Sequence, residues 1–324
     1  MNLDKNKKCI LVGLVAFIFG GICVYFFHDN NHDYDLSFSQ ERISDEYHFI
    51  SPLLECDSFE SKELNSFDED VYEWASELME NGSIEGLSYY FRDLNNGVWV
   101  GLNEEEKFAP ASLMKLPLMI SYLKQFEEND PNLLSQSYVF NIEDDNYGKQ
   151  NIVPEQTMSI GAYYTVEDLI FRMIAYSDNS ALSILLRNSG FFGFRVFDDL
   201  NIHLPKDKAS EDFMSTRTYS KFFRILYNAS YLNLENSEKA LEILSRTQYK
   251  DGIVAGVPDD VVVAHKFGER ENNGVKQLHD CGIVYHPDKP YVLCIMTRGD
   301  NTEKMSSAIA TLSKYTYEEV NSIF

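Results

Sequence analysis

The apolar residues of this chain repeat with different periods in its middle and at its two ends. Between residues 113 and 245 they recur every three or four positions, which is typical of helices packed on a core. The flanking stretches 87–102 and 261–297 show the patterns of strands. Strands at both ends can form one sheet only if distant segments pair. We therefore predict an α/β (α+β) fold: an antiparallel sheet built from N- and C-terminal segments, flanked by helices, with an inserted all-helical lobe.

Short-range signals place the individual elements. A helix begins at Phe67 and ends at Asn81-Gly82, and Asn96-Gly97 favours a hairpin turn. Residues 136–164 are expected to be irregular, and Thr165 opens a capping box at the start of a helix. The other expected helices are 215–227, 237–245 and 303–320, and the expected strands are 87–92, 98–102, 261–267, 278–285 and 291–297.

Two polar residues, Ser112 and Lys115, lie at the head of the apolar run Leu113–Leu123. Residues three apart share a helix face, so the hydroxyl and the amine would be neighbours. A lysine can accept a serine proton only if burial or a nearby cation lowers its pKa. The alternative is a serine that caps the helix beside a lysine reaching the surface. Pro117 indicates a late helix start or a kink.

Two further motifs follow in order: Ser177-Asp178-Asn179 after an amphipathic helix, and Lys266-Phe267-Gly268 on a late strand. The order Ser-x-x-Lys, Ser-Asp-Asn, Lys-Thr-Gly is the signature of class A β-lactamases and penicillin-binding proteins. From about Phe67 to the C-terminus the chain resembles this serine β-lactamase-like superfamily, nearest to class A β-lactamases. The resemblance implies an acyl-serine hydrolase without a metal or an organic cofactor.

The resemblance also implies three catalytic roles. Ser112 would attack an amide carbonyl and become acylated, and Lys115 would accept its proton. Ser177 would relay a proton to the leaving nitrogen, which requires a hydroxyl that donates and accepts at once. A cap between two helices is the alternative for Ser177, and Asp178 is expected to be a structural hydrogen-bond acceptor.

Substrate binding is expected at Asn179, Lys266, Gly268 and Glu269. Asn179 would hydrogen-bond the substrate amide and hold Lys115. Lys266 would attract the substrate carboxylate and lower the pKa of Lys115. The backbone N–H groups of Ser112 and Glu269 would form an oxyanion hole.

Phe267 replaces a hydroxyl that the family offers to the substrate carboxylate. Carboxylate binding is therefore expected to be weaker or to use another donor. His265, on the same strand, is expected to be structural, with a place in the wall of the cleft as the alternative.

The family's deacylating acid is missing. Class A β-lactamases carry a Glu-x-x-Leu-Asn loop whose Glu activates water. Here Phe197 occupies that Glu position, and the spacing of apolar residues 194–200 predicts a helix instead. Glu211 and Asp212 are the nearest acids, and both can simply begin the next helix. We therefore expect acylation followed by slow deacylation.

The N-terminal region differs from the rest. Residues 1–8 contain three lysines, and the uncharged run 9–27 is about long enough to cross roughly 30 Å of hydrocarbon. No small-x-small cleavage site follows it. We expect an uncleaved signal anchor with a cytoplasmic N-terminus. A polar, acidic tether (28–66) and an extracytoplasmic catalytic domain (67–324) would follow, so that the protein is a single-pass protein of the cell membrane.

Charge and cysteine content limit the partners. The chain has 28 basic and 51 acidic residues, a net charge of −23, which argues against nucleic acid. Of five cysteines, Cys281 and Cys294 lie on adjacent predicted strands. A cross-strand bridge would fit a hairpin register, but we expect two reduced core cysteines. No cysteine has metal-ligand spacing with histidine.

The leading hypothesis is a monomeric, membrane-anchored hydrolase that opens β-lactam amides through an acyl-enzyme at Ser112. One alternative is a D-alanyl-D-alanine-type carboxypeptidase, or penicillin-binding protein, acting on peptidoglycan peptides. Another is a sensor module that binds cell-wall peptides or β-lactams with negligible turnover. The absent glutamate and Phe267 favour this last alternative.

Overall fold

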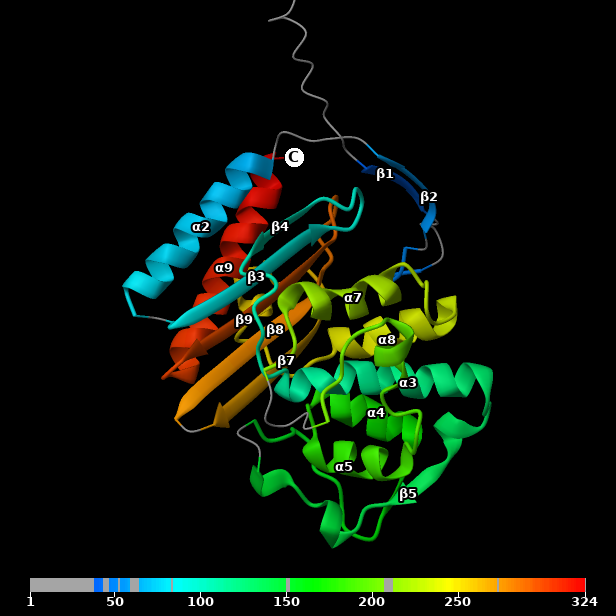
Figure 1. The fold of residues 1–324 in the computed structure, drawn as a ribbon. Coiled ribbons are helices and arrows are strands. Elements are labelled where there is room, and N and C mark those ends of the chain that lie inside the picture. The colour runs from blue at the N-terminus through cyan, green and yellow to red at the C-terminus, as the bar shows by residue number, and fades with distance from the viewer. Residues whose placement is uncertain are drawn as a thin grey trace, which may run out of the picture.

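A five-stranded antiparallel sheet, with strand order β4-β3-β9-β8-β7, forms the centre of the molecule in a computed structural model (Figure 1). The strands are β3 (Gly86–Asp93), β4 (Trp99–Leu102), β7 (Val263–Asn272), β8 (Val275–Val284) and β9 (Tyr291–Gly299). Because β3 pairs with β9, the N- and C-terminal segments share the sheet as predicted. The structure describes residues 38–42, 47–51, 53–58, 64–82, 84–149, 152–206, 212–272 and 274–323.

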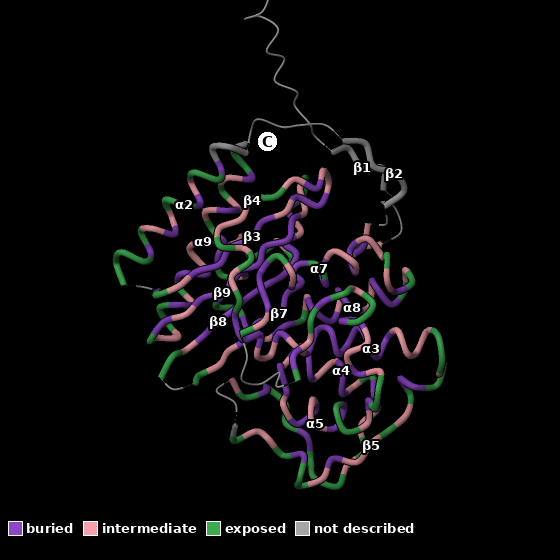
Figure 2. The backbone as a smooth tube through the Cα atoms, in the orientation of Figure 1, coloured by how far each residue is buried: buried purple, intermediate pink, exposed green. Residues whose placement is uncertain are grey.

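Two terminal helices, α2 (Leu64–Glu80) and α9 (Thr302–Ile323), lie side by side on one face of the sheet (Figure 1). Alternation along β3 turns Leu87, Tyr89 and Phe91 toward these helices, into one apolar cluster. Burying each such side chain contributes roughly 1.5–3 kcal/mol. Figure 2 shows the central strands as buried, whereas α2 exposes its outer side.

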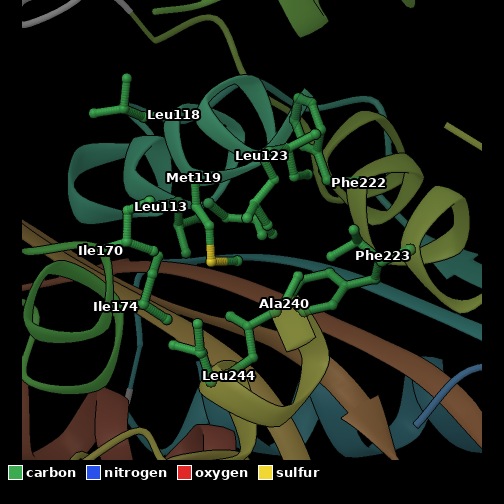
Figure 3. Close-up of a cluster of buried hydrophobic side chains, with 14 of the residues drawn as sticks. Leu113, Leu118, Met119, Leu123, Ile170, Ile174, Phe222, Phe223, Ala240 and Leu244 are labelled. Atoms are coloured by element: carbon green, nitrogen blue, oxygen red, sulfur yellow. The ribbon is translucent and has the colours of Figure 1, made fainter. Parts of the chain in front are cut away.

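The inserted helical lobe covers the opposite face, where α7 packs on β8 and β9 and α8 packs on β7 (Figure 1). Figure 3 shows Met119, Ile170, Phe223 and Leu244, from four helices of the lobe, in one buried cluster. The lobe and this face of the sheet therefore share a core. The lobe includes the 3₁₀ turn η1 (Ala111–Met114), α3 (Lys115–Glu128), α4 (Val166–Ala175), α5 (Asn179–Asn188), α6 (Arg195–Asp199), α7 (Thr216–Tyr227) and α8 (Leu234–Ser245).

The predicted elements are largely confirmed. Ser112 lies in η1 and α3 starts only at Lys115, so the late helix start indicated by Pro117 is found. The helix predicted from the spacing of apolar residues 194–200 is found as α6. Residues 136–164 consist mostly of short pieces, including β5 (Ser137–Val139), which pairs with β6 (Tyr163–Thr165).

Part of the predicted tether has regular structure. Within 28–66, β1 (Phe38–Arg42) pairs antiparallel with β2 (Leu53–Ser58). Between them, the backbone N–H groups of His48, Phe49 and Ile50 donate to the carboxylate of Glu238 on α8. The carboxylate of Glu238 therefore joins this part of the tether to the domain. The sequence pattern did not reveal this contact.

The predicted anchor, 9–27, and the cytoplasmic segment, 1–8, lie outside the described residues. In the described part of the chain, no helix combines the length and the apolar character needed to span a membrane.

Cys281 and Cys294 form a disulfide, so the expectation of two reduced cysteines was wrong. They face each other in the register of β8 and β9, with Cα atoms 4.0 Å apart. Direct cross-strand pairing brings two side chains within bonding reach, and this geometry prevails over the general preference of core cysteines for the reduced state.

Candidate active site

The three predicted motifs meet where β7, one of the two edge strands of the sheet, faces the helical lobe. Gly268 has no Cβ and so allows β7 to lie close to η1. A Cβ at this position would be only 2.8 Å from the carbonyl oxygen of Pro110 and 3.1 Å from the backbone nitrogen of Leu113. Any larger residue would push β7 away from η1. The glycine therefore brings the backbone around Glu269 to the turn that carries Ser112.

Ser112 occupies the second position of η1, directly after Ala111, whose φ is +50°. A non-glycine residue in this left-handed region costs about 1–3 kcal/mol and commonly marks a functional site. In a 3₁₀ turn, residues three apart eclipse each other, so Ser112 and Lys115 lie on one face as predicted. Within the described residues, the hydroxyl of Ser112 has no hydrogen-bond partner, which leaves it available to a substrate.

Lys115 is almost completely buried and ties the first two motifs together. Its Nζ lies 2.5 Å from the carbonyl oxygen of Ser177, 3.0 Å from Ser177 Oγ and 2.7 Å from Asn179 Oδ1. Burial lowers the pKa of Lys115 to about 7, against the opposing charges of Asp178 and Glu269. Near neutral pH a large share of the amine is therefore uncharged, and an uncharged amine can accept a proton.

Lys266 approaches the same hydroxyl from β7. Its Nζ donates to Ser177 Oγ at 3.0 Å and to the carbonyl oxygen of Phe267 at 2.8 Å. Burial, and then the charge of Lys115, holds the pKa of Lys266 well below its usual range. Burial is the chief cause of the lowered pKa of Lys115, whereas the like charge of the neighbouring lysine contributes to the lowered pKa of Lys266.

Ser177 links the two amines and lies in the turn between α4 and α5. Its φ is +52°, a second strained position at the site. Its Oγ is within 3.0 Å of both Lys115 Nζ and Lys266 Nζ. A hydroxyl between two amines can donate to one and accept from the other, which is the arrangement that a proton relay requires.

The two residues expected to be structural have structural partners. Asp178 caps α5 by accepting from the backbone N–H groups of Ser180 and Ala181. His265 is fully buried, and its Nδ1 lies 2.8 Å from Asp280 Oδ1. Neither side chain therefore needs a catalytic role to account for its position.

Sequence reasoning missed several residues that support the site. Tyr147, from the stretch expected to be irregular, donates its hydroxyl to Asp178 at 3.1 Å. Tyr219 of α7 donates to the carbonyl oxygen of Leu113 at 2.9 Å and so holds η1. Tyr249 stacks on Phe267 with ring centroids 4.5 Å apart. Because these contacts join segments far apart in the chain, no local pattern announces them.

Of the two acids considered for deacylation, only Asp212 lies within the described residues. Asp212 pairs with Arg298 at 3.2 Å and accepts from Gln277 at 3.2 Å. Glu211 lies outside the described residues. Phe197 is buried in the core of the lobe. Among the described residues, no group of three or more His, Cys, Asp or Glu side chains is arranged to hold a metal ion.

Several solved structures share the fold of this chain. A mutant of PBP-A solved as an acyl-enzyme complex with penicillin G is 20% identical, with a TM-score of 0.66, and the alignment covers 80% of this chain and 97% of that one. A class A β-lactamase from Mycobacterium abscessus is 20% identical, with a TM-score of 0.67 and coverage of 77% and 98%. One from Bacteroides cellulosilyticus is 18% identical, with a TM-score of 0.68 and coverage of 79% and 98%.

Identities this low establish the fold alone. No curated protein matches the chain. A family model, however, described as "Beta-lactamase enzyme family", matches residues 73–320, which include all three motifs. The chain therefore belongs to the β-lactamase enzyme family.

Proposed function

We propose that the protein is an acyl-serine hydrolase that opens β-lactam amides through a covalent intermediate on Ser112. The observation that carries this proposal is the buried network in which Lys115 and Lys266 both contact Ser177 Oγ. Lys115 would take the proton of Ser112 as Ser112 Oγ attacks the carbonyl carbon. Ser177 would then pass a proton to the nitrogen that leaves.

The backbone N–H groups of Ser112 and Glu269 are the proposed oxyanion donors. Support comes from Gly268, which permits the close contact of β7 with η1. Donors fixed in the backbone need no rearrangement as charge develops on the carbonyl oxygen. Asn179, already bonded to Lys115, would position the substrate amide.

The test is intact-mass analysis of the full chain mixed with benzylpenicillin, followed by peptide mapping. One adduct per chain, on the peptide that contains Ser112, is the expected result. A chain that stays unmodified at high penicillin concentration, or an adduct on another residue, would contradict the acyl-serine mechanism.

Deacylation is expected to be slow, since the position of the family's deacylating glutamate holds Phe197. General-base assistance contributes about a hundred- to ten-thousand-fold to rate. Penicillin should therefore give a burst of about one equivalent and then a slow steady state, the kinetic sign of an accumulating acyl-enzyme. Stopped-flow product release, read beside the adduct mass, measures both phases.

Asp212→Asn should change the slow phase little, because Asp212 is engaged with Arg298 and Gln277. A fast steady state without adduct, strongly reduced in Asp212→Asn or Glu211→Gln, would identify a replacement base. It would also show that the absence of the usual glutamate has been compensated.

A binding or sensor role with negligible turnover is the second candidate, and Phe197 in place of the glutamate favours it. The two candidates differ in the steady-state rate: a sensor would release no product after the burst. The peptidoglycan alternative, a D-alanyl-D-alanine-type carboxypeptidase, would use the same Ser112 chemistry on a peptide amide.

We also propose that residues 9–27 anchor a monomer in the cell membrane, with the catalytic domain outside the cytoplasm. The proposal is supported by the uncharged run and the lysines that precede it. N-terminal sequencing of the membrane-extracted protein should begin at or near Met1. A start beyond Phe27 would instead show that a signal peptide had been removed.

A further inference from the structure

Lys266 is covered by an aromatic ring at the edge of the sheet. The side chain is fully buried, and its Nζ is committed to Ser177 Oγ and to the carbonyl oxygen of Phe267. The same nitrogen lies 4.1 Å from the centroid of the Phe267 ring. An amine placed in this way has no exposed side from which an anionic group of a substrate could approach it.

The ring of Phe267 is itself held in place. It is 2% exposed and stacks on Tyr249, with an interplanar angle of 29°. The hydroxyl of Tyr249 is 2.7 Å from Ser306 Oγ on α9, which anchors the pair. An apolar stack thus occupies the position from which a threonine or serine hydroxyl would donate to a carboxylate.

Carboxylates lie near this stack. Asp280 faces Phe267 across the β7–β8 ladder, and Glu269 follows two positions later on β7. Burial, then the charges of Asp280, Asp251 and Glu269, raises the pKa of Tyr249. A substrate carboxylate near the stack would therefore meet like charges, which disfavours its binding.

Besides Lys266, one cation directly follows Tyr249 in the chain and another directly follows Glu269. Lys250 follows Tyr249 and is exposed to solvent, where its charge is screened. Arg270 lines a separate cavity of about 260 Å³ with Gln277, Asp212 and Arg298. Variants of both cations are therefore part of the test.

We propose that the site selects acyl donors without a carboxylate beside the scissile amide, so that substrates whose carboxylate is masked as a neutral ester or amide acylate Ser112 faster than the matching free acids. The inference rests on the proposed function, because it specifies the substrates of that same serine. The bond from Ser112 Oγ to the carbonyl carbon forms as the proton moves to Lys115. The carbon–nitrogen bond then breaks, and the nitrogen takes a proton through Ser177. No step in this sequence uses a substrate carboxylate.

Benzylpenicillin and its methyl ester provide the test, since both carry the same scissile amide. The second-order rate of adduct formation on the full chain is measured by intact mass for each compound. The ester should react about ten- to hundred-fold faster, the range expected when an ionised group is buried without its hydrogen bond.

Three variants test whether Phe267 and the nearby negative charge cause the difference in rate between the ester and the free acid. Phe267→Thr restores the hydroxyl and should lower the ester-to-acid ratio of rates about tenfold, and Glu269→Gln should lower it by removing a like charge. Glu271→Gln removes an exposed charge from the end of the same strand and should leave the ratio unchanged.

Two results overturn the inference, and they are distinguishable. If the wild-type protein prefers the free acid, the selection is wrong. If that preference disappears in Lys250→Gln or Arg270→Gln, one of those cations binds the carboxylate. If neither compound modifies Ser112, the proposed acyl-serine function has failed, and the inference fails with it.

Discussion

Ser112→Ala should abolish the penicillin adduct at every time and concentration. The hydroxyl of Ser112 has no partner among the described residues, whereas Ser177 Oγ, the other hydroxyl of the network, is within 3.0 Å of both lysine amines. A hydroxyl held between two amines is positioned to pass protons and is poorly placed to attack a carbonyl. Intact-mass analysis with peptide mapping measures the loss.

Ser159→Ala is the matched control, because Ser159 is exposed and lies outside the site. It should be acylated at the wild-type rate. If Ser112→Ala is still labelled and the adduct maps to Ser177, then Ser177 is the nucleophile and the assigned roles of the two serines are wrong.

Lys115→Met should slow acylation about a hundred- to ten-thousand-fold, the usual contribution of a general base. Methionine has a similar length and suits the buried position, so the loss can be assigned to the amine. Lys124→Met, on the same helix α3 but bonded to the carbonyl oxygen of Tyr231, should keep the wild-type rate. The measured quantity is the rate of adduct formation.

The pH dependence of the acylation rate is a second test of Lys115 as the base. Burial lowers the pKa of Lys115 to about 7, and only the uncharged amine can accept the proton of Ser112. Acylation should therefore be slow below this pKa, rise as the pH passes through about 7, and level off above it. The rise should be absent in Lys115→Met. A rise that persists in the variant would point to Lys266 as the base.

Much of the site could be predicted because its signals are local. The spacing of Ser112 and Lys115 follows from helix geometry, and the strand pattern of 261–267 placed Lys266 on the sheet. The sheet itself was predictable because strand periodicity at both ends leaves few other ways to pair. Element ends were less exact: β8 begins at Val275, three residues before the predicted start.

The remaining features depend on contacts that no local pattern encodes. The burial of Lys266 beneath Phe267 needs Tyr249, which comes from a different segment of the chain. The disulfide depends on the register of β8 and β9, and a one-residue slip would separate its sulfur atoms. The attachment of 48–50 to Glu238 joins positions 188–190 residues apart in the sequence.

The pairing of β3 with β9 has a consequence for how the protein is made. Synthesis proceeds from the N-terminus, so β3 emerges from the ribosome long before the strand that completes its hydrogen bonds. Until β9 arrives, the apolar residues of β3 have neither their central neighbour nor α9 to cover them. Such long-range pairing folds slowly and leaves strand edges exposed. Nascent chains that end before Tyr291 should therefore depend on chaperones, and their release should produce aggregates rather than a partly active lobe.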